Sequence, residues 1–405
     1  MTILMNPCPL AHWKKHRPDA LALSSLTYRE LDTLIQKICY ALPTQPILAF
    51  AAQPTPFYIA LFFAAWRLGK AVYPLNPRLP KRGLKERIQK TGATWIDPEE
   101  LVLTKTLEIS NIDENKLATF IETSSASKIA CHVLKSHLTS ATSAIQILNI
   151  RQDSKVCLNL PLFHVSGIAS MLRALIAGAQ IVFSEDATHI SMVPTQLYRL
   201  LKENKTLPIC QSLLMGGAPL PEKIYKLALE KKLPLLRSYG MTETASMIIC
   251  ENTVLPHAEI KFAQGGELMV KGPSLLSHYF GGNKIEDWFA TRDLGKINKQ
   301  GQIEITGRKD RQFISGGENI QPEEIEKALL TLDSVIGARI TSIEDAEFGR
   351  KIQATLYTEK TLIEENLKSQ LKELIAPHKI PKDWSIIIDE APSKLPLESA
   401  WKTRS

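Results

Sequence analysis

Short apolar runs alternate with amphipathic segments through the first three hundred residues of the chain. The runs at 46–50 (PILAF) and 71–75 (AVYPL) are followed by the helix-like segment 80–92 (PKRGLKERIQKTG), and similar alternation continues over residues 179–240. Buried parallel strands are continuous apolar runs, and the connections between them are usually helices. The pattern therefore predicts an α/β fold, in which a large N-terminal domain contains two β-α-β sheets.

The pattern changes after about residue 260 to short strands broken by turn residues, which predicts an antiparallel β subdomain. From about residue 310, strands and helices alternate again over a stretch short enough to be a separate, mobile α+β domain. We predict an N-terminal domain over residues 1–309 and a C-terminal domain over residues 310–405, joined at the charged segment 307–311 (GRKDR). The segments assigned to the antiparallel subdomain are 266–272 (GELMVKG), 277–282 (SHYFGG) and 293–307 (DLGKINKQGQIEITG).

Composition and charge narrow the class of partner. The 405 residues carry a formal charge of +7, with 49 basic and 42 acidic side chains but no long basic run, so we expect no nucleic-acid partner. The six cysteines are scattered without a C-x-x-C pair, which favours reduced thiols in a cytoplasmic protein. The longest apolar stretch, 58–69, is about half the length needed to span a bilayer. The sequence leaves the oligomeric state open, with a homodimer as one option.

Two motifs follow apolar strands and suggest a nucleotide site. A double glycine in 213–221 (LLMGGAPLP) would let a ligand approach the backbone closely, although such a pair is more often an ordinary turn. The segment 239–243 (YGMTE) places an aromatic ring, a hydroxyl and a carboxylate within five residues. These groups could stack on a base, hold a phosphate oxygen and hold Mg²⁺, respectively.

Three further residues have both a functional and a structural interpretation. His164 follows an apolar strand in 159–167 (NLPLFHVSG), where a packed, hydrogen-bonded histidine is the more common case. Asp293 and Arg308 are predicted at turns between short strands. There the carboxylate could accept both hydroxyls of a ribose and the guanidinium could reach the same sugar or a phosphate, whereas the alternative is a surface ion pair.

Taken in order and spacing, 239–243 (YGMTE), 291–295 (TRDLG) and 307–326 (GRKDRQFISGGENIQPEEIE) resemble the adenylate-forming superfamily of acyl-CoA synthetases, luciferases and adenylation domains. The resemblance runs from about residue 25 to the C-terminus. Within it, segments such as 161–179 (PLFHVSGIASMLRALIAGA) are most similar to the 2-succinylbenzoate–CoA ligases of menaquinone synthesis. It implies a small-molecule carboxylate, ATP, Mg²⁺ and CoA as reactants: the carboxylate attacks the α-phosphate to give an acyl-adenylate and pyrophosphate, and the CoA thiol then displaces AMP.

The resemblance also implies a role for each matching residue of the large domain. The nucleotide contacts lie in two segments and one pair of residues. They are Gly216, Gly217 and Ala218 beside the adenine, Tyr239 against the base with Gly240 and Met241 after it, and Asp293 and Arg308 at the ribose. Thr242 is similar to the hydroxyl that contacts the phosphate, and Glu243 to the carboxylate that holds Mg²⁺. His164 resembles the residue that borders the acyl pocket and the CoA tunnel.

The C-terminal part supplies a hinge, a second loop and a lysine by the same resemblance. Asp310 falls at the hinge about which the small domain rotates after adenylation. The loop containing Gly316, Gly317 and Glu318 then lines the entrance for the thiol. Lys402 matches the lysine that bridges carboxylate and phosphate, although Trp401 stands where the family has glycine, and an exposed terminal lysine is the alternative.

The predicted phosphate loop departs from the family pattern. Alignment after 118–122 (ATFIE) places it over 123–132 (TSSASKIACH), which contains no glycine. Its hydroxyls remain at Thr123, Ser124 and Ser127. Three family glycines are replaced by Ser125, Lys128 and His132, and the family lysine by Cys131. Lys128 could restore the lost charge from a shifted position.

These departures leave several functions to weigh. The first is a working ligase for 2-succinylbenzoate, with another aromatic or fatty acid as a variant of it. The second is a degenerate member that binds an acyl or nucleotide ligand with little turnover, and the third an adenylation domain or luciferase-like enzyme. Arg173 or Arg199 could meet the second carboxylate of succinylbenzoate, and for each the alternative is a residue on a helix surface.

Overall fold

The computed structural model describes residues 8–123, 128–332, 335–358 and 360–388. Its largest element is a nine-stranded sheet, in which the five neighbouring strands β12, β11, β10, β8 and β9 run parallel. In spatial order the strands are β14 (Thr253–Val254), β13 (Ser246–Cys250), β12 (Leu235–Met241), β11 (Ser212–Met215), β10 (His189–Met192), β8 (Lys155–Cys157), β9 (Gln180–Val182), β1 (Leu21–Leu23) and β2 (Leu26–Thr27).

A second sheet has six strands, of which β3, β4, β5 and β6 pair in parallel. Its spatial order is β17 (His278–Tyr279), β7 (Ile129–Val133), β6 (Leu117–Glu122), β4 (Ala71–Leu75), β3 (Ile47–Ala51) and β5 (Thr94–Trp95). The two sheets confirm the predicted α/β alternation.

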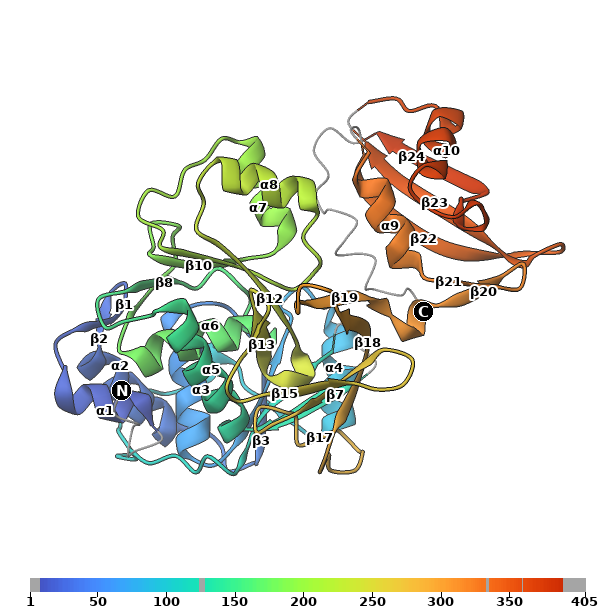
Figure 1. Ribbon diagram of the computed structural model, residues 1–405. Helices are drawn as coiled ribbons and strands as arrows, with labels where there is room; N and C mark the ends of the chain where they lie inside the picture. The colour runs from blue at the N-terminus through green and yellow to red at the C-terminus, as the bar shows by residue number, and fades with distance from the viewer. Residues whose placement is uncertain (1–7, 124–127, 333–334, 359, 389–405) are drawn as a thin grey trace.

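Helices join the strands and share one apolar core with both sheets. This core contains Leu23 and Ile181 from the nine-stranded sheet, Phe50 and Ile121 from the six-stranded sheet, and side chains of the packed helix pairs α2–α3 and α5–α6 (Figure 1). None of the helices among the described residues is both long and apolar enough to cross a membrane. The helices of this part are α1 (Pro9–His16), α2 (Tyr28–Ala41), α3 (Pro56–Arg67), α4 (Lys81–Thr91), η1 (Pro98–Glu100), α5 (Leu134–Leu148), α6 (Val165–Ala177), α7 (Pro194–Lys202), α8 (Glu222–Glu230) and η2 (Thr242–Thr244).

Local chemistry sets several helix ends. Helix α2 begins at a capping box, in which the Thr27 hydroxyl accepts from the Glu30 backbone N–H while the Glu30 carboxylate accepts from the Thr27 backbone N–H. Helices α4 and α6 end at Gly92 and Gly178, both with a positive φ that a glycine adopts without strain.

The predicted antiparallel subdomain is a four-stranded sheet in the order β15 (Glu259–Phe262), β16 (Glu267–Lys271), β18 (Phe289–Ile297) and β19 (Ile303–Arg308). One part of that prediction is wrong. The segment SHYFGG contains β17, which pairs with β7 and so belongs to the six-stranded sheet. His278 pairs with Cys131, which lies 147 residues earlier in the chain, a distance at which short-range sequence patterns carry no pairing information.

The C-terminal residues form a separate apolar core. Its buried members run from Phe313 to Leu371, and they come from α9 (Pro322–Leu330), α10 (Glu364–Lys372) and neighbouring strands. Figure 1 shows this part to one side of the large sheets, with α9 and the β20–β21 hairpin nearest to β19. The remaining elements are η3 (Lys309–Arg311), β20 (Phe313–Ser315), β21 (Glu318–Ile320), β22 (Val335–Asp345), β23 (Gly349–Thr358), η4 (Pro377–Lys379) and β24 (Asp383–Ile388).

The predicted phosphate loop is shorter than the sequence suggested. Thr123 donates its backbone N–H to the carbonyl of Lys128 at 3.0 Å, so the hairpin between β6 and β7 closes there. Residues 129–132 lie in β7, where Cys131 pairs with Phe120 on one side and His278 on the other. Cys131 is fully buried, and burial raises the pKa of its thiol to about 12. The position of the family lysine is therefore a core position in this chain, and the prediction that the loop extends to His132 is wrong.

Placing a lysine at position 131 should destabilise the fold. Cys131→Lys would bury an ammonium that has no carboxylate partner in this core, at an expected cost of about 3 kcal/mol or more in the free energy of unfolding. Chemical denaturation measures the difference directly. Cys131→Ala is the control and should lose only about 1 kcal/mol; a Cys131→Lys variant as stable as Cys131→Ala would contradict the buried assignment.

Candidate active site

A buried carboxylate connects two of the predicted motifs. Asp293 on β18 accepts a hydrogen bond from the Tyr239 hydroxyl at 2.6 Å and another from Arg308 Nη1 at 3.1 Å. Arg308 also donates to both carboxylate oxygens of Asp310, at 2.8 and 2.7 Å. One chain of contacts thus runs from β12 in the nine-stranded sheet, through β18 and β19, to the residue predicted as the hinge.

Asp293 and Arg308 do not occupy turns, as the sequence suggested. They lie opposite each other on paired strands, and β18 continues past Asp293 because the irregular positions are absorbed within the strand. Arg292 has a φ of 64°, and the register shifts between Leu294 and Gly295. The Asp293 side chain is 7% exposed, so the surface ion pair considered from the sequence is also wrong for this residue.

Burial governs the protonation of this cluster. It raises the pKa of Asp293, against the opposing effects of the Tyr239 hydrogen bond and the Arg308 charge. It also raises the pKa of Tyr239 well above its ordinary value, so the phenol remains a hydrogen-bond donor. The hydrogen bonds from Arg308 lower the pKa of Asp310, which keeps that carboxylate ionised.

The double glycine lies beside the start of this chain of contacts. Gly216 follows β11, and Ser238 on β12 donates its hydroxyl to the carbonyl of Met215 at 2.8 Å. A Cβ at Gly216 would come within 2.9 Å of the Ser238 Oγ, and Gly217 has a φ of +81°. The backbone at 216–218 thus reaches the carboxyl end of β12, where Tyr239 lies. The family resemblance implied this proximity, since it assigned both segments to the adenine; the carboxyl ends of neighbouring parallel strands meet at one edge of a sheet.

The motif YGMTE makes a tight approach to the strand after it. A Cβ at Gly240 would meet the Ser246 carbonyl oxygen at 2.1 Å, so only glycine fits there. Thr242 and Glu243 lie in the short helix η2. Glu243 accepts a hydrogen bond from the Tyr279 hydroxyl at 2.8 Å. The sequence pattern included Tyr279 in a strand motif without a role, and its pairing with Glu243 could not be predicted from spacing.

Two buried histidines lie close to the YGMTE motif. The rings of His132 and His137 are 4.9 Å apart, and His137 Nε2 bonds to the Thr119 hydroxyl at 2.7 Å. The carbonyl of Thr242 is close enough to favour protonation of His132, yet neither of its ring nitrogens has a hydrogen-bond partner among the residues that the structure describes. Burial lowers the pKa of His132 to about 4, so the ring is neutral at pH 7.

Helix α6 carries one exposed and one buried candidate. His164 lies at the N-cap position with its side chain exposed beside Phe163. Arg173 is 3% exposed and donates to the Ser246 hydroxyl at 2.9 Å, while its Nε has no hydrogen-bond partner in the described ranges. The helix-surface alternative is therefore wrong for Arg173, whereas Arg199 on α7 is exposed.

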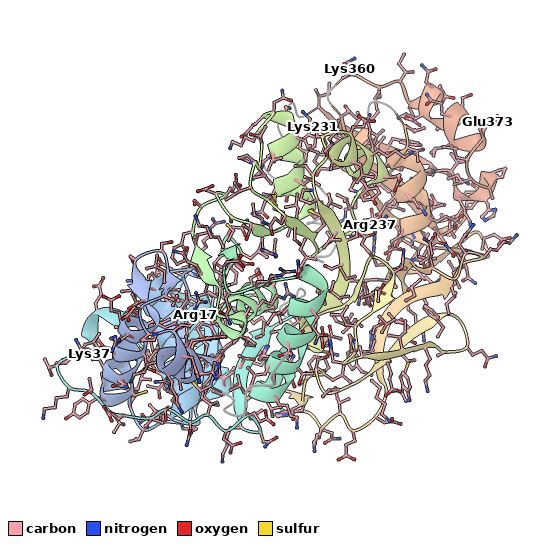
Figure 2. The ribbon with its side chains drawn as sticks, turned by 60° about the vertical axis from the view of Figure 1, so that its left-hand side comes forward. Arg17, Lys37, Lys231, Arg237, Lys360 and Glu373 are labelled. Atoms are coloured by element: carbon pink, nitrogen blue, oxygen red, sulfur yellow. The ribbon has the colours of Figure 1, made fainter. Side chains whose placement is uncertain are left out.

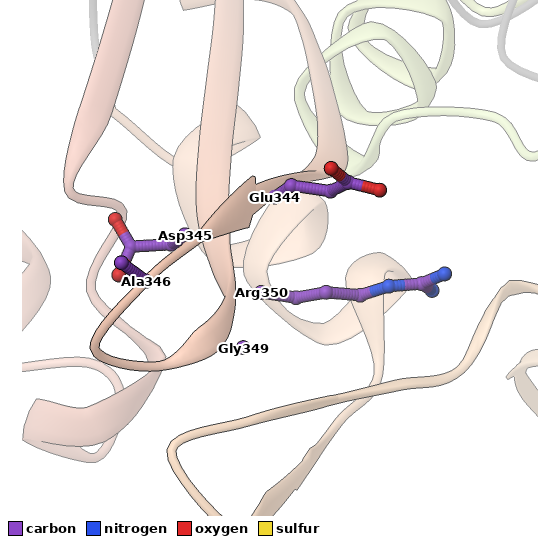
Figure 3. A pocket seen from close by; sticks show the side chains of 5 residues that line it. All are labelled: Glu344, Asp345, Ala346, Gly349 and Arg350. Atoms are coloured by element: carbon purple, nitrogen blue, oxygen red, sulfur yellow. The ribbon is translucent and has the colours of Figure 1, made fainter.

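The predicted thiol loop lies in the C-terminal part. Gly316 and Gly317 form the turn of the β20–β21 hairpin, and Gly316 donates its backbone N–H to the Phe348 carbonyl at 3.1 Å. The adjoining β22–β23 turn borders a shallow hollow of about 430 Å³, on which the cross-strand partners Glu344 and Arg350 point to the same side (Figure 3). Glu318, which follows the Gly316–Gly317 turn, is exposed. The described contacts of Gly316 and Gly317 are thus with the small domain.

Several predicted residues cannot be placed. Ser124, Ser127 and Lys402 lie outside the described residues. Thr123 is buried at the base of the loop, and its hydroxyl approaches the Lys128 carbonyl at 3.3 Å. Basic side chains are spread over the molecule: in Figure 2 Arg17 and Lys37 lie toward one end and Lys231 and Lys360 toward the other.

Comparisons with known proteins agree with the resemblance drawn from the motifs. The model of the AMP-binding enzyme family matches residues 10–134 and 105–280. The chain is 28% identical to a 2-succinylbenzoate–CoA ligase of Escherichia coli (strain K12), with 94% of each chain covered. It is 30% identical to the ligase of the same name from Listeria innocua, over 75% of this chain and 70% of that protein.

Solved structures give the same result. An o-succinylbenzoate CoA synthetase from Bacillus subtilis, in complex with the acyl-adenylate intermediate OSB-AMP, superimposes with a TM-score of 0.85 at 26% identity, covering 98% of both chains. The synthetase of the same name and organism in complex with ATP and a magnesium ion has a TM-score of 0.84 at 26% identity, covering 97% of this chain and 99% of that one.

The buried His132 predicts a loss of stability in mild acid. Its pKa is about 4 in the folded protein and near the ordinary 6.5 when unfolded, so between these values the unfolded state takes up a proton that the folded state does not. Lowering the pH from 7 to 5 should therefore remove about 2 kcal/mol through this ring alone.

Denaturant unfolding of the wild type and of His132→Gln at both pH values measures this contribution. The variant should lose about 2 kcal/mol less than the wild type between pH 7 and pH 5. The exposed His378 provides the matched control, and His378→Gln should keep the wild-type pH dependence. An unchanged pH dependence in His132→Gln would contradict the neutral buried ring.

Proposed function

The chain belongs to the AMP-binding enzyme family, and we propose that it is an ATP-dependent ligase that converts 2-succinylbenzoate to its CoA thioester through an acyl-adenylate. Adenylation requires a nucleotide site that holds ribose and phosphate beside a carboxylate. Tyr239 and Arg308 both donate to Asp293, and Thr242 and Glu243 lie three and four residues after Tyr239. A cluster with these groups, at the carboxyl end of parallel strands, suits an α/β nucleotide enzyme.

The buried positive charge of Arg173 is the observation that favours a dicarboxylic acid as the substrate. Its guanidinium is buried beside Ser246 and His257, and burial lowers its pKa to about 10, so it remains charged at pH 7. An isolated buried cation is costly unless a carboxylate pairs with it. A dicarboxylic acid provides that partner, because one carboxylate reacts while the other stays ionised.

The pocket must open to admit the acid. The space beside Arg173, which is lined by both aliphatic and polar side chains, measures about 10 Å³, which is room for roughly one water. It is bordered by the hydroxyls of Ser170, Ser191 and Ser212. These hydroxyls can bond to a carboxylate or a keto oxygen after the side chains rearrange.

The residues of the site account for the two half-reactions. In the first, a carboxylate oxygen of the acid forms a bond to the α-phosphorus of ATP, and the bond from that phosphorus to the bridging oxygen of pyrophosphate breaks. Asp293 accepts hydrogen bonds from the ribose hydroxyls, and Thr242 holds the α-phosphate by its hydroxyl. Such in-line displacements depend on positioning and on neutralisation of charge.

One carboxylate fits the expected metal. Mg²⁺ usually keeps several waters and takes one or two protein carboxylates together with substrate phosphates. Glu243 supplies one such carboxylate, and the Tyr279 hydroxyl orients it. The ion, when bound, neutralises phosphate charge.

In the second half-reaction the CoA thiol gives up its proton and its sulfur forms a bond to the acyl carbon. The bond from that carbon to the phosphate oxygen breaks, and AMP leaves with the bonding electrons. We propose that residues 310–405 rotate about Asp310 between the two steps, removing Lys402 and bringing the Gly316–Gly317 turn to the site. The bidentate contact between Arg308 and Asp310 lies at this boundary. A separate C-terminal core supports movement as a unit.

A pyrophosphate-release assay tests the function. With ATP and 2-succinylbenzoate, release should reach a stoichiometric burst and continue only when CoA is added. The burst reflects an acyl-adenylate that stays bound until the thiol arrives. A degenerate binding protein would give no release with this acid or with a panel of aromatic, fatty and short carboxylates.

Arg173→Gln should weaken binding of the acid without affecting binding of ATP. Loss of a charge-assisted contact predicts an increase of roughly 10- to 100-fold in KM for 2-succinylbenzoate, with KM for ATP unchanged. For an aromatic keto acid that lacks the second carboxylate, wild type and variant should be equal. The control is Arg82→Gln, which alters an exposed side chain of α4; an equal change in KM for both acids would refute the assignment.

Lys402→Ala should affect only one half-reaction. We expect adenylation to fall at least ~100-fold, because the lysine stabilises charge between carboxylate and phosphate. Thioester formation from chemically supplied acyl-adenylate should be largely retained, since the lysine has left the site by then. Single-turnover measurements of both steps decide the point, and equal losses would contradict the two-conformation proposal.

A further inference from the structure

We propose that Lys128 binds the β- and γ-phosphates of ATP and the pyrophosphate formed from them, in place of a lysine at position 131. This proposal rests on the function proposed above, because it assigns a phosphate contact in the same site. Position 131 cannot supply the charge, since Cys131 is a buried residue of β7.

The backbone fixes Lys128 at the edge of the site. Its carbonyl accepts the hydrogen bond from the Thr123 N–H that closes the β6–β7 hairpin. The next residue, Ile129, is already in the strand and pairs with Glu122. The Cα of Lys128 is thus held by the sheet, while its side chain is exposed and free to change rotamer.

The side chain lies over the ring of Tyr279, whose hydroxyl bonds to Glu243, the carboxylate proposed to hold Mg²⁺. Lys128 Nζ lies 4.6 Å from the centre of the Tyr279 ring, and the hydroxyl of that ring donates to Glu243 Oε1 at 2.8 Å. A hydrogen bond from a phenol to a carboxylate makes the ring more electron-rich and so strengthens its attraction for a cation. Lys128, Tyr279 and Glu243 form one contact series, which we call the Lys128 relay.

The relay places a cation where phosphate charge must be neutralised. The carboxylate of Glu243 would hold Mg²⁺, and the ion would neutralise phosphate charge there. Two arginines also act on Tyr279. Arg308 is already engaged by Asp293 and Asp310, and Arg292 is an exposed residue of β18. No ion pair involves Lys128 within the described part of the chain, so its charge is available to a ligand.

The magnitudes favour transfer of the ammonium from the ring to a phosphate. A cation–π contact at an exposed site contributes about 0.5–1 kcal/mol. A hydrogen bond to a charged group contributes about 1.5–3 kcal/mol. The flexible four-carbon stem of lysine allows this movement without a change of backbone. Tyr279 is thus a positioning residue that holds Lys128 near the site before ATP binds.

Binding of different nucleotides tests Lys128 without any acid present. Calorimetric titration should show that Lys128→Ala weakens MgATP and pyrophosphate at least ~10-fold, while AMP binds as it does to the wild type, because AMP lacks the β- and γ-phosphates. Lys128→Arg should restore most of the MgATP affinity. The control is Lys135→Ala, which removes one positive charge from an exposed pair with Glu114.

The outcome separates this proposal from the proposed function. Equal weakening of AMP and MgATP would indicate a structural role and overturn the assignment, as would unchanged binding of MgATP. The wild type could fail to adenylate 2-succinylbenzoate while Lys128→Ala still changes the ratio of the MgATP affinity to the AMP affinity. In that case the choice of acid is wrong and the phosphate contact stands. Equal melting temperatures of the variants confirm that the ratio does not report unfolding.

Discussion

The hydrogen bonds that converge on Asp293 hold the parts of the molecule in register. Its two oxygens accept from Tyr239 on the nine-stranded sheet and from Arg308 on the four-stranded sheet. Because the carboxylate is buried, the cost of removing it from water must be offset by these donors. The same donors fix the geometry that a ribose would meet. In the proposed nucleotide site, structural stability and ribose recognition would therefore depend on one set of contacts.

This arrangement also ties the site to the boundary of the C-terminal core. Arg308 donates to both Asp293 and Asp310, so a movement at Asp310 would displace the arginine that also bonds to Asp293, the carboxylate of the proposed ribose site. Immediately after the boundary, Arg311 pairs with Glu323 and Glu326 inside the small domain. The chain is thus anchored on both sides of Asp310. The hinge proposed at Asp310 would therefore be confined to few residues, which suits rotation of a rigid unit.

The sequence was informative where function depends on local order. The alternation of strands and helices, the Gly-Gly turn and YGMTE could be predicted because each depends on neighbouring residues and on the shared edge of parallel strands. It was uninformative where contacts are long-range. The pairing of β17 with β7, the burial of Cys131 and the meeting of Tyr279 with Glu243 all join segments far apart in the chain. Asp293 and Arg308 were assigned to turns because a strand that contains a positive φ resembles a turn in sequence.

The departures in the phosphate loop are better understood as a redistribution than as decay. A chain that had lost its function would be free to lose the partners of Asp293, the close approach at Gly240 and the buried charge of Arg173, yet all three are present. An unpaired guanidinium in a core is destabilising unless an anionic ligand compensates for it. Its retention is thus a cost that ligand binding explains and folding alone does not. The same reasoning applies to Lys128. The ring of Tyr279 holds its ammonium and also bonds to Glu243, whereas position 131 lies buried in strand β7 and leaves no space for a cation.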